Sequence, residues 1–287
     1  MPVTDAGLRP LPLVDVTALL PPDRAALLEL LSGLDADEWQ QPTECPAWNV
    51  GGVALHVLGD DLSLLSRQRD AGVQGLVRYG ESHPGLNFRQ LLDGFNEQWV
   101  TAAEFLSPEL IVALLDATGR WTADFYSSVD PHELNEPVGL FAVQDASPYW
   151  QISAREYLER FIHQHQIRRA TRRPDLGREF LVAAGEVVAH MIAAHAGGLT
   201  LQPGTTIGVE IDGVAGWTVE LGATAASVFS GVVTSPSVAV TIDADAATPV
   251  LSRGLTAREV KARLCVTGPD DLANTLTEGF ALLAGRP

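Results

Sequence analysis

Apolar side chains recur every three or four positions over roughly the first 170 residues, which is the spacing of amphipathic helices. Residues 21–34 open with prolines suited to a first helical turn, repeat leucine at helical spacing and stop at Gly33. Residues 48–70 carry valine and leucine at the same spacing behind Asn49, a residue type favoured at the N-cap. Two more helices of this kind are expected over residues 88–106 and 107–126. The pattern predicts a four-helix bundle in the N-terminal part.

The helical pattern is interrupted once before it ends. Residues 133–150 contain several prolines and glycines, and we expect a connecting loop there. Residues 153–171 return to helical spacing, and Ser153 and Glu156 stand in the S-x-x-E order of a capping box. We therefore expect this helix to begin at Ser153.

Beyond Pro174 and Gly177 the period of the pattern changes. A helix from residue 179 comes first, and then apolar and polar residues alternate between Gly and Asp turns, which is strand patterning. The alternating runs are TIGVEIDG, GWTVELG and SVAVTIDAD, followed by the helical runs TPVLSRG, TAREVKARL and DDLANTLTEGFALLAG. The sequence predicts an α+β protein of two domains, a helical bundle over residues 1–175 and a small α+β sandwich over residues 176–287.

Composition and charge narrow the classes of function. Acidic residues number 36 against 19 basic ones, a formal net charge of −17, which would repel a phosphate backbone and argues against a nucleic-acid partner. We expect no membrane helix, because no apolar run reaches about 18 residues, and no secretory signal at the N-terminus. Cys45 and Cys265 stand far apart without CxxC spacing and are expected to be reduced thiols. These features favour a cytoplasmic protein.

The pair Glu159 and His163 is a candidate for metal binding. Four residues of helix separate them, which places both side chains on one face, one turn apart, as a helix offers two ligands to one ion. The same spacing joins two other pairs, Glu186 with His190 and His56 with Asp60. Spacing alone therefore does not select a site, and a surface hydrogen bond is the alternative for each pair.

Among the remaining histidines, His56 is the best candidate for a metal ligand. It lies in a helix dense in apolar residues, where an unpaired imidazole costs free energy unless a partner receives it. A satisfied core histidine and a metal ligand are both consistent with that setting. The others are poorer candidates: His165 is expected to point away from His163 into solvent, His190 and His195 are spaced badly for a shared ion, and His83 and His132 fall in loops.

Several segments resemble the mycothiol-dependent maleylpyruvate isomerase family. They are PTECPAWNVGGVALHV, LSRQRD, FNEQWV and ERFIHQHQIRRA. The N-terminal domain of that family belongs to the wider group of DinB-like metal-binding helical bundles. Members typically continue into a domain similar to sterol-carrier proteins, and LCVTGPDDLANTL resembles its closing segment. The resemblance covers nearly the whole chain.

The resemblance implies a divalent ion, zinc by preference, held by His56, Glu159 and His163. Three protein ligands leave one coordination position open, as in catalytic sites. That position would take water at rest and the thiolate of the cosubstrate mycothiol in use. In the maleylpyruvate reaction the thiolate would add to the conjugated double bond, and bond rotation followed by thiol elimination would give the trans isomer. Arg168, our candidate cofactor-binding residue, would pair with a ligand carboxylate, although the helix dipole also favours a cation there.

Two departures from the family pattern leave a second hypothesis open. The family commonly has an acidic residue where this chain has Gln166, and a Gly-Arg pair where Gly254 is followed by Leu255. The first hypothesis is a mycothiol-dependent isomerase or thiol transferase that acts on a small acidic electrophile. The second is a non-enzymatic metal-containing protein whose C-terminal domain binds an apolar ligand or a partner. Either would be a monomer or a homodimer.

Overall fold

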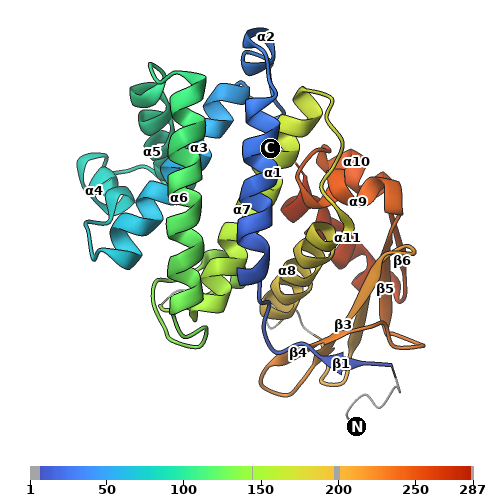
Figure 1. The fold of residues 1–287 in the computed structure, drawn as a ribbon. Coiled ribbons are helices and arrows are strands. Elements are labelled where there is room, and N and C mark those ends of the chain that lie inside the picture. The colour runs from blue at the N-terminus through green and yellow to red at the C-terminus, as the bar shows by residue number, and fades with distance from the viewer. Residues whose placement is uncertain (1–6, 144, 197–200, 286–287) are drawn as a thin grey trace. The chain divides into compact units, whose positions relative to one another are not determined.

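The computed structural model describes residues 7–143, 145–196 and 201–285 (Figure 1). It divides into two compact units, and the expected α+β class is confirmed. The helical unit comprises Thr17–Val129 and Gln166–Pro174, and the sheet unit comprises Met1–Val16, Asp130–His165 and Asp175–Pro287. The sequence-based domain boundary at residue 175 stays a prediction. Parts of two expectations, the N-terminal residues 1–6 and the end of the helix from residue 179, lie outside the described residues.

The helical unit is a set of packed helices. They are η1 (Thr17–Leu19), α1 (Leu20–Ser32), α2 (Ala36–Trp39), α3 (Val50–Leu64), the π-helical turn η2 (Leu65–Arg69), α4 (Gly75–Ser82), α5 (Phe88–Ala103) and α6 (Pro108–Ser128). Helix α6 packs against α1 and α3, α3 also packs against α5, and α4 lies against α5 (Figure 1). Leu31, Leu58 and Leu115 are fully buried among these helices.

The helix ends follow the capping residues of the sequence. The Asn49 side chain accepts a hydrogen bond from the Gly52 amide at 2.8 Å, so the expected N-cap is confirmed. Gly33 stands at the C-cap of α1, also as expected. Asn87 caps α5 in a capping box with Gln90, which was not predicted from the sequence.

A buried ion pair ties three helices of this unit together. Arg24 of α1 donates to the Asp61 carboxylate of α3 at 2.7 Å, and the Thr118 hydroxyl of α6 donates to the same oxygen at 2.7 Å. Arg24 also donates to the Leu115 carbonyl at 2.9 Å. Because charged side chains buried in this way need partners, the three helices are held in one register by their polar groups as well as by packing.

Helix α7 (Tyr149–Ala170) begins earlier than the sequence predicted. The expected capping box of Ser153 and Glu156 is wrong, because Ser153 lies inside the helix and donates to the Trp150 carbonyl at 3.1 Å. The amides of Tyr149 and Trp150 donate to carbonyls of the preceding loop, each at 3.0 Å. Backbone groups therefore satisfy the first turn, and no side-chain cap is needed.

The sheet unit is built on a six-stranded mixed sheet. Its strands are β1 (Arg9–Pro10), β2 (Thr206–Ile211), β3 (Ala215–Leu221), β4 (Ala226–Ser230), β5 (Val238–Ile242) and β6 (Leu264–Thr267), in the order β1-β4-β3-β2-β5-β6. Strands β2 and β5 pair in parallel, and the other neighbours are antiparallel. The strands expected from TIGVEIDG, GWTVELG and SVAVTIDAD are confirmed as β2, β3 and β5.

Helices accompany the sheet in the same unit. They are η3 (Gly139–Phe141), α8 (Arg178–Ala196), α9 (Ala244–Leu251), α10 (Ala257–Ala262) and α11 (Asp270–Ala284). Helix α8 packs on β3 and β4, where Gly185 lies so close to Trp217 that a Cβ would overlap the indole ring. By length and hydropathy alone α8 could cross a membrane, but 56% of it is buried in the protein, as in the core helix of a globular fold.

Candidate metal centre

His56 is held in α3 with only 6% of its surface exposed. The indole of Trp48, two residues before the helix begins, stacks on the imidazole at 4.8 Å between ring centroids. A Cβ on Gly52 would lie 2.8 Å from the Cβ of Trp48, so only glycine at that position lets the indole pack along the first turn. The local sequence W-N-V-G-G therefore both starts the helix and orients the histidine.

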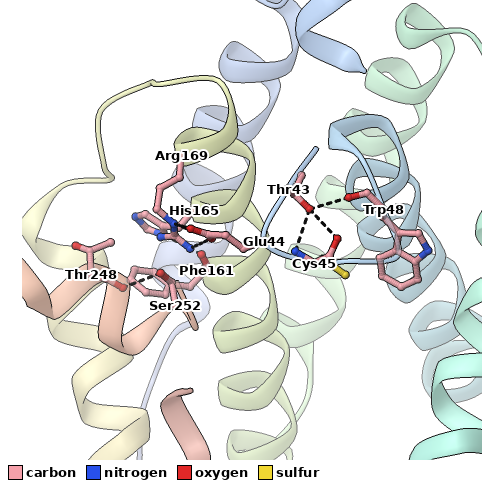
Figure 2. Close-up of polar contacts among 9 residues, drawn as sticks. All are labelled: Thr43, Glu44, Cys45, Trp48, Phe161, His165, Arg169, Thr248 and Ser252. Carbon is pink, nitrogen blue, oxygen red and sulfur yellow. Dashed lines mark hydrogen bonds and ion pairs between the residues drawn. The ribbon is translucent and has the colours of Figure 1, made fainter. Parts of the chain in front are cut away.

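Polar contacts fix the loop that carries Trp48. The Thr43 hydroxyl donates to the Trp48 carbonyl at 2.8 Å and accepts from the Cys45 amide at 3.1 Å (Figure 2). The guanidinium of Arg169 binds the Glu44 carboxylate through Nε at 2.7 Å and through a terminal nitrogen at 2.5 Å (Figure 2). A bidentate pair of this kind is directional, so the loop has little freedom to shift.

The Nε2 atom of His56 faces a carboxylate of its own helix. Asp60 Oδ2 lies 3.4 Å from it, and the Asp60 side chain is 26% exposed. The spacing of this pair along the helix is too common to mark it as a site. The structure places the carboxylate next to the candidate ligand atom.

Glu159 and His163 lie one turn apart on α7, as predicted. Glu159 Oε2 is 3.5 Å from His163 Nε2. Burial alone would raise the pKa of Glu159, but the hydrogen bond with His163 and the positive charges of Arg155 and Arg253 outweigh it and hold that pKa well below its usual range. The carboxylate is therefore ionised at neutral pH and can act as an anionic ligand.

The three predicted ligands form one group. One candidate ligand atom from each of His56, Glu159 and His163 lies within 4.8 Å of the other two. In a tetrahedral zinc site with bonds near 2.1 Å, ligand atoms are about 3.4 Å apart. The 3.5 Å between Glu159 and His163 already matches that edge. Two imidazoles and one carboxylate are also a donor set that zinc accepts, so the residues fit such an ion.

Other residues singled out from the sequence have structural partners. Arg168 donates to the carbonyls of Pro174 at 2.8 Å and Ala26 at 3.3 Å, and its assignment as a cofactor-binding residue stays a prediction. Gln166 is buried and Leu255 is partly exposed. The positive charge of Arg253 lowers the pKa of Glu159, and its backbone is left-handed with φ of 54°. No spacing rule would have paired residues 159 and 253.

The prediction that His165 is solvated is wrong. Only 1% of its surface is exposed, its Nδ1 lies 2.8 Å from the Phe161 carbonyl, and its Nε2 accepts from the Leu176 amide at 3.3 Å. The ring also contacts Phe161 of the preceding turn (Figure 2). The helical-wheel argument failed because this face of α7 is covered as well. His83, His132 and His195 are exposed.

Cys45 is half-buried. Desolvation raises the pKa of its thiol, with smaller lowering effects from nearby backbone amides, so the thiol is protonated at neutral pH. A protonated thiol is a poor nucleophile, so this state does not favour a catalytic role for Cys45.

The chain combines a helical unit with a six-stranded mixed sheet and has a group of two imidazoles and one carboxylate. The family model of the mycothiol maleylpyruvate isomerase N-terminal domain matches residues 20–168, just over half of the chain. The chain belongs to this family.

Solved structures agree on the fold. Crystal structures of the mycothiol-dependent maleylpyruvate isomerase and of a histidine-to-alanine mutant of it are 11% and 10% identical, with TM-scores of 0.50 and 0.51. Each covers 85% of this chain and 90% of its own. The solution structure of palmitated SCP2L2 from Aedes aegypti is 24% identical over 31% of the chain, and its TM-score of 0.24 supports no inference. The sterol-carrier-like C-terminal domain therefore stays a prediction. No curated protein matches the sequence.

Proposed function

We propose that this protein is a metal-dependent enzyme that uses mycothiol to isomerise or otherwise modify a small acidic electrophile such as maleylpyruvate. Family membership, together with the grouping of His56, Glu159 and His163, carries the proposal. We propose these three side chains as the ligands, zinc as the ion and the cytoplasm as the place of action.

A zinc ion with three protein ligands leaves one position open and lowers the pKa of a thiol that occupies it. Residues of the chain orient and charge the ligands around that position. Trp48 holds the His56 ring in one orientation, and the lowered pKa of Glu159 keeps a negative charge available as a ligand. A fixed ligand geometry matters because the groups that orient metal ligands typically change metal affinity by about 10- to 100-fold.

Two cations near Glu159 support an acidic substrate. Arg155 and Arg253 both lower the pKa of that carboxyl, so positive charge lies close to it. Arg253 is further held by a hydrogen bond from its Nε to the Leu283 carbonyl at 3.2 Å, which leaves its terminal nitrogens as donors. Arg155 is ion-paired with Glu156, so we propose that Arg253 attracts and orients a carboxylate of the substrate.

The alternative is a metal-containing protein without catalytic activity. Gln166 and Leu255 favour it, because both stand where the family pattern has an ionisable residue. An amide can orient a neighbouring ligand but cannot balance charge.

Cobalt substitution separates the two functions. A thiolate bound to cobalt adds a charge-transfer band in the near ultraviolet, and we expect that band with mycothiol and a weaker response with glutathione. A protein that retains cobalt but whose spectrum no thiol changes at millimolar concentration would exclude the thiol-dependent enzyme and leave the binding protein.

A further inference from the structure

Two side chains of the segment FNEQWV in α5 bind groups that adjoin His56. Glu97 Oε2 accepts a hydrogen bond from the Trp48 indole Nε1 at 2.7 Å. Two residues further along, the Trp99 indole Nε1 donates to the Leu55 carbonyl at 2.7 Å. Leu55 directly precedes His56 in the chain, and Trp48 stacks on the His56 imidazole. Helix α5 therefore holds the surroundings of the candidate ligand at two points, all within the helical unit.

Trp99 fixes where α5 lies on α3. Its indole packs against Gly59, where an added Cβ would overlap the ring. The two helices therefore approach as closely as a glycine permits, and the hydrogen bond to the Leu55 carbonyl sets the direction of the indole. Glu97 lies on the same helix, so its position relative to His56 is set by this packing.

The bond from Trp48 to Glu97 restricts a motion that stacking leaves open. The planes of the Trp48 and His56 rings are 29° apart, and ring contact alone lets the indole turn or slide. A hydrogen bond from Nε1 ties the far side of the indole, and hydrogen bonds to a carboxylate are stronger than those between neutral groups. The Thr101 hydroxyl donates to the other Glu97 oxygen at 3.3 Å, which helps to hold the carboxylate in place.

We propose that Glu97 is a positioning residue of the metal centre. It holds the Trp48 indole, and through that ring the His56 imidazole, in the orientation that binds the ion. The inference rests on the metal ligation by His56 proposed above. Glu97 is exposed, so the alternative is a surface hydrogen bond that has no effect on the metal.

Zinc affinity of the full chain, measured by competition with a chelator, tests this role. Glu97→Leu removes the acceptor at similar size and should weaken zinc binding about threefold, since one orienting hydrogen bond is lost. Glu97→Gln keeps an acceptor oxygen and should bind zinc nearly as tightly as wild type. If Glu97→Leu does not fold, as judged by circular dichroism, Glu97→Ala takes its place.

Asp93→Asn is the matched control. Asp93 is exposed, lies one turn earlier on α5 and pairs with Arg89 at 3.7 Å. Desolvation is the main cause of the raised pKa of Cys45, and Asp93 and Glu97 both add to it, so both carboxylates lie near the loop that carries Trp48. The control removes the same charge from the same surroundings and should leave zinc affinity unchanged.

A double variant separates positioning through Trp48 from a general effect on the fold. In Trp48→Ala the ring between Glu97 and His56 is absent, so adding Glu97→Leu should weaken zinc binding no further. Independent effects would multiply instead.

Several results would overturn the role of Glu97 and leave the metal centre in place. They are wild-type zinc affinity in Glu97→Leu, an equal loss in Glu97→Gln or in Asp93→Asn, and a further threefold loss in the double variant. A wild type that binds no zinc, or wild-type affinity in His56→Ala, would instead overturn the proposed ligation and this inference with it.

Discussion

The indole of Trp48 stacks on the imidazole of His56, with ring centroids 4.8 Å apart and ring planes 29° apart. Since the imidazole would otherwise rotate about its side-chain torsions, this contact sets the direction of the ligand nitrogen. We expect Trp48→Ala to weaken metal binding by about tenfold, in the range seen when an orienting group is lost. Trp48→Phe keeps a stacking ring and should be close to wild type. Competition with a metal chelator measures both, and equal affinity of wild type and Trp48→Ala would contradict this role.

Removing a ligand should remove the ion. We expect the purified protein to carry close to one zinc ion per chain, and His56→Ala or His163→Ala to lose it. Glu186→Gln alters the other Glu–His pair with the same helical spacing and should retain the ion. Elemental analysis of protein purified without added metal gives the result. Retention of the ion by both histidine variants would move the site elsewhere.

The buried pair of Arg24 and Asp61 should respond unequally to single and double substitution. Asp61→Leu leaves a buried guanidinium without its carboxylate and should lower the free energy of unfolding by about 3–5 kcal/mol. Combining it with Arg24→Met removes both charges and should recover most of that loss. Urea unfolding followed by circular dichroism measures each. A double variant as unstable as the single one would show that packing, not charge, is decisive there.

Two residues offered as helix caps should differ in effect. Asn49→Ala removes an observed cap of α3 and should cost about 1 kcal/mol of stability. Ser153→Ala lies inside α7 and should cost no more than about 0.5 kcal/mol. The two substitutions are compared by thermal unfolding. A larger loss at Ser153 would restore the capping box that the structure rejects.

Stability should fall at acid pH partly through His190. The pKa of His190 is lowered to about 4 in the folded protein from an ordinary 6.5. Between these two pH values the unfolded chain binds a proton at this histidine, whereas the folded protein does not. This contribution to stability is complete above pH 6.5 and is lost as the pH falls through 4, by about 3 kcal/mol at pH 4. The difference in unfolding free energy between wild type and His190→Phe should therefore change between pH 7 and pH 4 and stay constant above pH 7. A constant difference throughout would contradict the shift.

Local sequence signals predicted much of the fold. The regular spacing of apolar residues, together with residues that start or stop an element, identified α1, α3, α5, α6 and three of the strands. Short elements were missed: α4 has only eight residues, and β1 has two and exists only because it pairs with β4. The start of α7 was misplaced because the partners of its first amides, the carbonyls of residues 131 and 133, are set by the folded loop.

The candidate site could be predicted less completely. Glu159 and His163 share a helix, so their mutual placement follows from helix geometry. The approach of Arg253 to Glu159 depends on tertiary folding, as does the cover over His165. Sequence reasoning finds neighbours along a helix, whereas neighbours from distant segments require a resemblance or a structure.

Strand β1 pairs with β4 in a register that joins Arg9 to Ser230, 221 positions apart in the chain (230 minus 9). Closing so long a loop costs chain entropy before the strand pairing contributes any stabilising hydrogen bonds. Contacts between residues far apart in the sequence therefore form late in folding. During synthesis the first residues must therefore wait until most of the polypeptide has left the ribosome. The Leu11 amide also donates to the Val228 carbonyl at 2.8 Å. This edge of the sheet is therefore completed only after β4 has been synthesised.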